Sequence, residues 1–177
     1  MRAFLALLPE PDTALAIDRW RTLCWRELPG AVPVQNLHVT LAFLGEIDAV
    51  QQDRLVEVLD AVQSEPFSLA FGSVGYQLDQ RMLWLEPAPA STGRAALDSL
   101  VSALRTACAR AGIAVDKGRY RPHMTLARRL ATPAPSPLVD PSAVLVADSF
   151  HLMASRLKPG GPIYQIERSW RLGSDPA

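Results

Sequence analysis

Two short segments of this sequence share one pattern, His-x-Thr-Leu-Ala. The first, His-Val-Thr-Leu-Ala, begins at His38, and the second, His-Met-Thr-Leu-Ala, begins at His123, 85 residues later. An imidazole can take or give a proton near neutral pH, and a threonine hydroxyl can donate a hydrogen bond to an oxyanion. Two imidazoles and two hydroxyls at one site would suit an acid and a base on opposite sides of a phosphorus atom.

The repeat has two other interpretations. A duplicated strand could keep histidine and threonine only as hydrogen-bonded polar groups of the fold, as a single such pair often is. A metal site is the chemical alternative, but catalytic zinc takes about three protein ligands and neutral hydroxyls are poor ones. We therefore expect acid–base catalysis with no metal and no cofactor. The third histidine, His151, lacks a threonine two residues later and is expected to be an ordinary strand or surface residue.

Basic residues gather around the second repeat. The segment 117–129 contains no acidic residue and has five basic ones, which are Lys117, Arg119, Arg121, Arg128 and Arg129. A guanidinium matches the oxygens of a phosphate, although such a segment could also be a solvated basic loop. Arg128 follows the predicted strand directly and is the best candidate, followed by Arg121, which shares the parity of His123. We expect Arg119 and Arg129 to face solvent.

Each repeat is predicted to lie on a β-strand. Side chains two residues apart share a face of a strand, so His38 and Thr40 project together, and His123 and Thr125 do the same. The apolar residues between them point to the other face. Each copy therefore presents an imidazole beside a hydroxyl, backed by the hydrophobic core.

Apolar periodicity predicts further strands along the chain. The predicted strands cover residues 1–8, 37–44, 67–72, 82–85, 122–128, 144–153 and 163–172. A proline-rich loop follows the fifth strand. Because helices and strands are interspersed but several strands follow one another directly, the order favours an α+β fold with antiparallel pairing over a doubly wound parallel sheet.

Three segments are predicted to be helical. The first covers residues 13–28, the second is capped by Asp48, and the third is capped by Ser91 or Thr92 and stopped by Gly112. In the first helix, the residues at helical spacings are Leu15, Ala16, Arg19, Trp20, Leu23 and Cys24.

Composition indicates one globular domain. The chain has 177 residues, 49% of them hydrophobic, and equal numbers of basic and acidic residues, 18 of each. This balance gives no general attraction to nucleic acid or membranes and excludes disorder as the main state. Cys24 and Cys108 are expected to be free thiols. The apolar run at residues 3–8 is too short for a signal peptide, so we expect a cytoplasmic protein.

The two repeats and their surroundings resemble the two-histidine phosphoesterases. The similarity is greatest to the bacterial and archaeal RNA 2′,3′-cyclic phosphodiesterases, also called 2′-5′ RNA ligase or LigT-like proteins. The most similar segments are residues 1–9, 36–46 and 121–128, with smaller similarities at 83–85, 155–157 and 161–164.

This resemblance implies a single bilobal α+β domain over residues 1–177. Two pseudo-symmetric halves with antiparallel sheets would line a central cleft, with helices packed outside. The implied reaction is metal-independent hydrolysis of RNA 2′,3′-cyclic phosphate ends to 2′-phosphates, together with the reverse 2′-5′ ligation. His38 would be the proton donor and His123 the proton acceptor. The residues expected to bind the substrate are Thr40, Thr125, Arg128, Arg121 and Tyr164.

The expected partners are RNA ends or nucleotides that carry a 2′,3′-cyclic phosphate, with no membrane, and we expect a monomer. Two alternatives stay open. The chain could act on small cyclic nucleotides or on an ADP-ribose cyclic phosphate, or it could be a non-catalytic module that binds RNA ends. Binding alone does not need two groups in opposite protonation states, so turnover of any cyclic phosphate would exclude the binding module.

Overall fold

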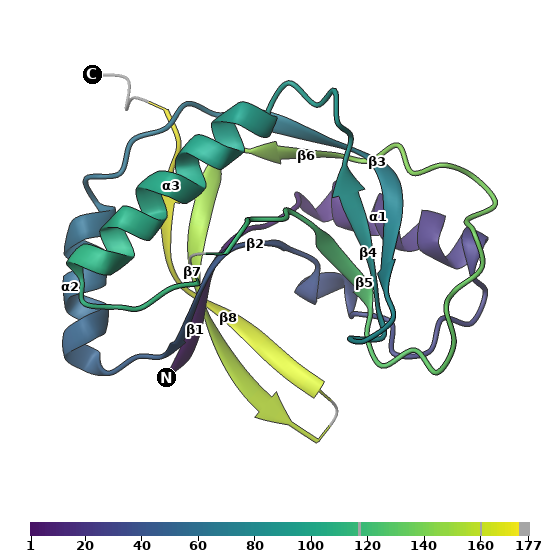
Figure 1. The fold of residues 1–177 in the computed structure, drawn as a ribbon, viewed down its shortest axis with the longest axis horizontal. Helices are drawn as coiled ribbons and strands as arrows, with labels where there is room; N and C mark the ends of the chain where they lie inside the picture. Colours follow the sequence, from purple (N-terminus) through teal and green to yellow (C-terminus); the bar gives the residue numbers. More distant parts are fainter. Residues whose placement is uncertain (117, 160, 174–177) are drawn as a thin grey trace.

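The computed structural model describes residues 1–116, 118–159 and 161–173, so Lys117 of the basic segment lies outside the described residues. These residues form eight strands, three α-helices and one short 3₁₀ helix (Figure 1). In chain order, the elements are β1 (Arg2–Leu7), α1 (Pro11–Cys24), η1 (Val34–Asn36), β2 (Val39–Glu46), α2 (Ala49–Leu59), β3 (Phe67–Gln77), β4 (Met82–Pro87), α3 (Arg94–Arg110), β5 (Met124–Ala127), β6 (Val144–Ala147), β7 (Ser149–Lys158) and β8 (Gly161–Arg171).

The strands form a sheet in the order β6-β3-β4-β5-β2-β1-β7-β8. Every pairing is antiparallel, which confirms the predicted α+β class. The sheet consists of two four-stranded halves, one ending at β5 and the other at β2. The halves meet where Val39 of β2 pairs with Met124 of β5. They are therefore parts of one continuous sheet, and the two repeats lie on the strands at the junction.

The sheet curls until its two ends approach each other. We predicted one strand over residues 144–153, but the structure divides this segment at Asp148 into β6 and β7. β6 pairs with β3 at one edge of the sheet, whereas β7 pairs with β1 and β8 near the other edge. Since a single residue joins β6 to β7, the sheet has to bend round into the open half-barrel seen in Figure 1.

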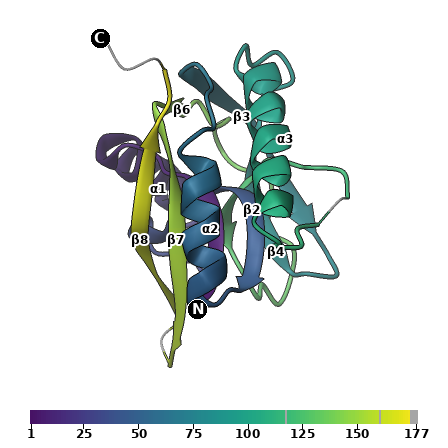
Figure 2. The ribbon, with the colours of Figure 1, turned by 90° about the vertical axis from the view of Figure 1, so that its left-hand side faces the viewer.

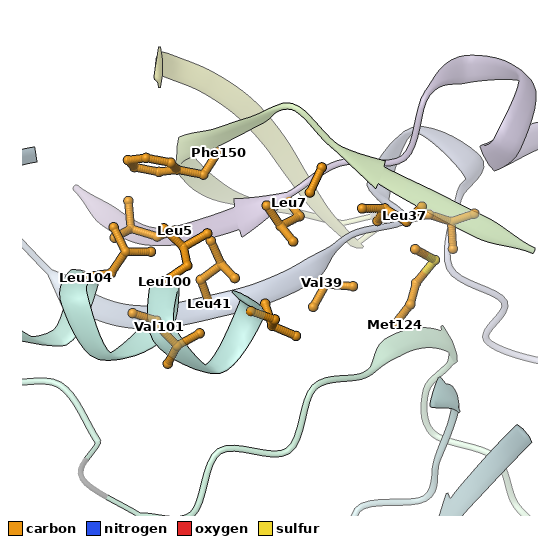
Figure 3. Packing of buried hydrophobic residues seen from close by; sticks show 14 of the residues in the cluster. Leu5, Leu7, Leu37, Val39, Leu41, Leu100, Val101, Leu104, Met124 and Phe150 are labelled. Atoms are coloured by element: carbon orange, nitrogen blue, oxygen red, sulfur yellow. The ribbon is translucent and has the colours of Figure 1, made fainter. Parts of the chain in front are cut away.

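The two faces of the sheet have different environments. On β1, Leu5 and Leu7 are fully buried in the main core, on the same side as residues of β2 and α3 (Figure 3). Phe4 and Ala6 point to the other face and form a second, smaller cluster with Met153. Alternation along the strand thus separates a large core beneath the helices from a face that carries the repeats.

The helices connect the two halves. α1 follows β1 along the chain but packs behind the half that contains β4 and β5 (Figure 1). α3 follows β4, yet its Leu100, Val101 and Leu104 pack beside residues of β1, β2 and β7 (Figure 3). Viewed from the side, α2 and α3 lie next to each other, with β7 and β8 on one side and β3 and β4 on the other (Figure 2). None of the helices in the described ranges is long and apolar enough to cross a membrane.

The buried face of α1 agrees only in part with the face that residue spacing predicted, in which Trp20 and Cys24 do pack, half-buried, against the core. Ala14, Ile17 and Arg21 are buried, whereas Leu15 and Leu23 are exposed. The burial of Arg21 explains the difference, because a charged residue is rarely expected inside. Its guanidinium forms an ion pair with Asp18 and donates to the carbonyls of Val32, at 2.8 Å, and Leu126, at 2.9 Å. Arg21 therefore joins α1 to β5, next to the second repeat.

Some predicted helix ends agree with the structure and others do not. α1 covers Pro11–Cys24 instead of residues 13–28, since the chain is already extended at Trp25. Asp48 caps α2 through a capping box with Gln51, and α3 ends shortly before Gly112, whose φ is +74°. The prediction that Ser91 or Thr92 caps α3 is wrong, since Gly93 is the N-cap. A side-chain Cβ on Gly93 would collide with the carbonyl oxygen of Ser68, so the helix begins where the chain passes directly over β3. The hydroxyl of Ser91 instead accepts a hydrogen bond from the amide of Ala70.

Several strand boundaries also differ from the predictions. β7 extends to Lys158, five residues beyond the predicted end at Met153, because it forms a long hairpin with β8. β3 extends to Gln77, five residues beyond the predicted end at Gly72, because it continues as one arm of a long hairpin with β4. β5 is confined to Met124–Ala127, and β2 begins at Val39. Both catalytic candidates, His38 and His123, thus stand immediately before a strand rather than inside it.

Candidate active site

The two repeats lie side by side at the junction of the two halves. Val39 pairs with Met124, and this antiparallel register sets His38 next to Thr125 and Thr40 next to His123. The intervening apolar residues Val39 and Met124 are fully buried, as the alternation predicted. Two imidazoles and two hydroxyls are therefore presented together at the centre of the sheet.

Both histidine rings are held in the same way. Nδ1 of His38 lies 2.6 Å from the carbonyl oxygen of Asn36, and Nδ1 of His123 lies 2.9 Å from that of Arg121. A carbonyl can only accept, so Nδ1 carries the hydrogen in each case. This leaves Nε2 of both rings for proton transfer, and the other nitrogen keeps the ring in orientation.

His38 is surrounded by aromatic rings. The centroid of its imidazole lies 5.0 Å from that of Phe4 and 5.2 Å from that of Tyr164, and only 8% of the residue is exposed. The pKa of His38 is lowered from 6.5 to about 4, mainly by burial, with smaller contributions from the charges of Arg128 and His123, and against the opposing effect of the Asn36 carbonyl. His38 is therefore neutral at pH 7.

His123 stands at the wall of a cavity. It is half-buried, and its ring centroid lies 5.7 Å from that of Trp84 on β4. The cavity has a volume of about 340 Å³ and is bordered by His123 and Thr40, but not by His38. The two histidines of the repeat thus differ in their access to water and to ligands.

Thr125 and Arg128 form a small group at the end of β5. Thr125 is buried, and its hydroxyl donates to the sulfur of Met82 at 3.6 Å. The guanidinium of Arg128 turns back along the strand and donates to the hydroxyl of Thr125 at 3.4 Å. The backbone of Arg128 packs directly on Gly30, where φ is +66° and a Cβ would collide with the Arg128 carbonyl oxygen. Gly30 is therefore needed for the chain to bring Arg128 to the site.

Comparisons with known proteins identify the family of this arrangement. A family model described as the 2′-5′ RNA ligase superfamily matches residues 9–155. The chain belongs to this superfamily. It is 28% identical over 172 residues to the RNA 2′,3′-cyclic phosphodiesterase of Escherichia coli (strain K12), covering 97% of this chain and 96% of that protein. It is 36% identical over 131 residues to the protein of the same name from Bacillus subtilis (strain 168), covering 69% of each.

Solved structures from the superfamily have the same fold. Escherichia coli LigT in its apo form superposes with a TM-score of 0.85 at 27% sequence identity, covering 98% of both chains. The Thermus thermophilus protein TT0787 superposes with a TM-score of 0.80 at 26% identity, covering 97% of both. The match extends over almost the whole chain and therefore includes both histidine repeats.

The remaining candidates from the basic segment take different positions. Arg121 is exposed and borders the cavity, on the side of His123. Arg119, which we expected only to face solvent, is exposed but also borders the cavity. Arg129 is exposed in a left-handed conformation, with φ of +59°, and does not border it. Between Arg119 and Arg121, Tyr120 donates to the carbonyl of Thr40 at 2.9 Å and so fixes this loop to β2.

Several neighbours of the histidines were not predicted. Phe4, Trp84 and Met82 lie on strands, where sequence patterns identify them only as apolar strand residues. Asn36 holds His38 through its carbonyl, and its side chain also donates to the carbonyl of Pro162 at 2.9 Å. This bond secures the β7–β8 hairpin that carries Tyr164. An asparagine two residues before a histidine gives no recognisable signal in a single sequence.

Other titratable groups lie apart from this arrangement. Within the described ranges, no three His, Cys, Asp or Glu side chains are close enough together to hold a metal ion. Both ring nitrogens of His151 contact serines, Ser149 and Ser169, as expected for a strand residue. Cys24 and Cys108 are free thiols, as predicted.

Proposed function

We propose that this chain hydrolyses RNA 2′,3′-cyclic phosphate ends to 2′-phosphates by acid–base catalysis without a metal. The observation that carries the proposal is the pairing of the two repeats, which brings two imidazoles together with Nδ1 of each already occupied by a carbonyl. Two such rings can supply a base and an acid to one phosphorus centre.

The proposed reaction is a single displacement at phosphorus. Nε2 of His123 removes a proton from a water molecule, and the water oxygen forms a bond to phosphorus. The bond from phosphorus to the ribose 3′-oxygen breaks, and Nε2 of His38 gives its proton to that oxygen. Thr40, Thr125 and Arg128 hold the other phosphate oxygens. The partial exposure of His123, compared with the burial of His38, supports its role as the base, because water reaches its ring more easily.

His38 must carry a second proton before it can act as the acid. Its pKa of about 4 means that this proton is absent at neutral pH. A phosphodiester carries one negative charge, and an opposite charge near a buried imidazole favours its protonated form. We therefore propose that substrate binding restores the proton on His38. The same groups with exchanged roles would join a 5′-hydroxyl to the cyclic phosphate as a 2′-5′ bond.

The substrate class is supported by the named relatives. Both relatives described above are RNA 2′,3′-cyclic phosphodiesterases, and Escherichia coli LigT has been crystallised in complex with 3′-AMP. All five proposed site residues come from the same chain, so we propose a monomer that acts as one bilobal domain over residues 1–177. Free thiols at Cys24 and Cys108 are consistent with the cytoplasm as its location.

The decisive experiment is a product assay. Purified protein is incubated with nucleoside 2′,3′-cyclic phosphates and with an oligoribonucleotide that ends in one, and the product isomer is identified by phosphorus NMR. The expected product is the 2′-phosphate from the RNA end. A dominant 3′-phosphate would contradict the proposed bond cleavage.

The same assay separates the alternatives. Turnover of mononucleotides without turnover of the RNA end would assign a small-molecule phosphodiesterase. Tight binding of the RNA end without turnover of any cyclic phosphate would assign a binding module. No observation in the structure favours either of them over the RNA phosphodiesterase.

A further inference from the structure

The cavity beside His123 has a second wall that the reaction above does not use. This wall comes from the β3–β4 hairpin and includes Gln77, Trp84 and Glu86, and Thr40 and His123 border the same cavity. With a volume of about 340 Å³, the cavity falls within the range of small-molecule sites. Any ligand group that occupies it therefore lies next to the hairpin and to one of the two histidines.

Trp84 lies in the same cross-strand row as the repeats. It pairs with Gly75 on β3 and with Thr125 on β5, and Thr125 is in turn next to His38 in the sheet. Side chains that oppose each other across strands share one face of the sheet. Trp84 is therefore separated from the first repeat by one strand only, on the face where the phosphate is proposed to bind.

Gly75 allows the indole of Trp84 to lie flat on the sheet. A Cβ added to Gly75 would collide with both Cε2 and Nε1 of Trp84, far inside van der Waals contact. The indole thus covers the position that a side chain on β3 would occupy. A glycine inside a strand weakens it, and its presence often marks the close approach of another group. One face of the ring rests on β3, which leaves the opposite face for the cavity that Trp84 borders.

Glu86 holds the indole of Trp84 in its orientation. Its carboxylate accepts a hydrogen bond from Nε1 of Trp84 at 2.7 Å. The same Cβ on Gly75 would also meet this carboxylate oxygen at 2.7 Å, so Gly75, Trp84 and Glu86 are packed as one unit. The polar atom of the indole is satisfied within this unit. What the ring offers to a ligand is therefore its π-face, which recognises flat aromatic groups and not hydrogen-bond donors.

We propose that Trp84 is the platform on which the base of the terminal nucleotide stacks, held in place by Gly75 and Glu86 as positioning residues. This proposal rests on the function proposed above, because a base in this cavity lies next to His123 and is attached to the ribose whose phosphate is opened. Every base has a π-face, so stacking tolerates all four bases. We expect purines to bind more tightly than pyrimidines, since they cover more of the indole.

The test compares substrates with and without a base. Adenosine 2′,3′-cyclic phosphate carries both the cyclic phosphate and the base, whereas the 1,2-cyclic phosphate of glycerol has the same reacting ring and no base. Trp84→Leu should raise KM for the adenosine substrate by roughly 5- to 150-fold, with a much smaller change in kcat. Its loss of activity on the glycerol substrate should be much smaller. Trp84→Phe should recover most of the loss, because phenylalanine also stacks.

Gly75→Ala provides an independent test, because it leaves Trp84 in the sequence but displaces its ring. We expect the same selective rise in KM for the adenosine substrate. Trp20→Leu is the matched control, since Trp20 is also a half-buried tryptophan and donates to the carbonyl of Val139, outside the cavity. Equal losses on both substrates in Trp84→Leu would overturn the proposal, because Trp84 would then act on the catalytic groups or on the fold.

A binding measurement tests the stacking platform independently of turnover. If the wild-type protein turned over neither substrate, that result would contradict the proposed function, and the binding measurement would still decide whether Trp84 is the platform. Calorimetry with adenosine 2′-monophosphate and with inorganic phosphate uses the same variants. Trp84→Leu should weaken binding of the nucleotide by the same factor and leave phosphate binding unchanged. Equal nucleotide affinity in the wild type and in Trp84→Leu would overturn the platform.

Discussion

The two histidine repeats have the same backbone support and opposite surroundings. Each imidazole donates from Nδ1 to the carbonyl two residues before it. His38, however, is enclosed by Phe4 and Tyr164, and burial lowers its pKa to about 4, whereas His123 is half-buried at the wall of a cavity. The repeated motif therefore provides the geometry of the rings, and neighbours outside the motif provide the chemical difference between them.

Acid–base catalysis at phosphorus requires two groups in different protonation states, and the low pKa of His38 has to be raised by the bound phosphate before His38 can act as the acid. Two titratable groups whose environments separate their protonation can serve as acid and base at one pH. Two identical imidazoles in identical pockets would titrate together and would compete for the same role. The following predictions test whether the two sites differ in the way that the structure indicates.

The largest effect should come from removing either imidazole. His38→Ala and His123→Ala should each reduce kcat/KM on the cyclic substrate by roughly 10²- to 10⁴-fold. The p-nitrophenolate of an aryl phosphodiester departs without an acid, so His38→Ala should recover much of its activity on such an ester, and His123→Ala should not. Circular dichroism controls for folding. Selective recovery of His123→Ala would mean that the two roles are reversed.

The burial of His38 should make stability depend on pH. Its pKa is about 4 in the folded chain and near 6.5 in the unfolded chain, so between these values the unfolded chain binds one more proton. The free energy of unfolding should therefore be higher above pH 6.5 and fall as the pH approaches 4, by up to about 3 kcal/mol from this group. Urea unfolding of the wild type and of His38→Gln at pH 7 and pH 4.5 measures the difference. An identical pH dependence in the two proteins would contradict the lowered pKa, and His123→Gln serves as the comparison.

A smaller effect is expected from the basic residue nearest to Thr125. Arg128→Ala should lower kcat/KM by about 10- to 100-fold, because a hydrogen bond to a charged group typically contributes about 1.5–3 kcal/mol. Arg129→Ala, which removes an exposed guanidinium from the neighbouring position, should have little effect. If Arg129→Ala proves the more damaging change, Arg128 is not the residue that holds the phosphate.

The pocket around His38 can also be opened without touching the imidazole. Tyr164→Ser should admit water and raise the pKa of His38 toward its ordinary value, because burial is the main cause of the low value. Nitrogen-detected NMR titration of the imidazole measures this pKa. Phe43→Ser is the control, since Phe43 is 64% exposed and its ring contacts Phe4. A pKa that is unchanged in Tyr164→Ser would show that this ring does not shield His38.

We expect no effect on activity from the removal of metal ions. A metal-independent mechanism predicts that EDTA leaves turnover of the cyclic phosphate unchanged. Loss of activity in EDTA, with recovery on addition of Zn²⁺ or Mn²⁺, would contradict it. Wild-type protein after extensive dialysis against the chelator is the material for this assay.

The geometry that the two repeats share could be predicted from the sequence. The difference between the surroundings of His38 and His123 could not. Strand alternation was sufficient to place His38 and Thr40 on one face, because the period of two is a local property. Phe4 contacts His38 from a strand more than thirty residues earlier, and Trp84 contacts His123 from another hairpin. In the sequence both are apolar residues of predicted strands, and nothing local separates an active-site aromatic from a core residue.

The fold shows the same limit at two other positions. The strand predicted over residues 144–153 has the correct pattern throughout, and only the pairing of its two parts with different neighbours reveals the bend at Asp148. The burial of Arg21 was not predicted. The carbonyls that accept hydrogen bonds from its guanidinium belong to Val32 and to Leu126, the latter more than a hundred residues away. Local patterns predict helices and strands, whereas long-range contacts determine where a strand is interrupted or a charged residue can be buried.

The position of β1 between β2 and β7 has a consequence for biosynthesis. β1 pairs with β2 soon after synthesis, but its other edge waits for β7, as in the pair Ala6 and His151, which are separated by 145 residues. Until β7 emerges from the ribosome, an apolar strand of the nascent chain keeps one row of amides and carbonyls unpaired. Such long-range pairing slows folding and extends the time in which that edge can pair with another chain. The protein is therefore expected to depend on chaperones during translation more than a helical chain of equal length.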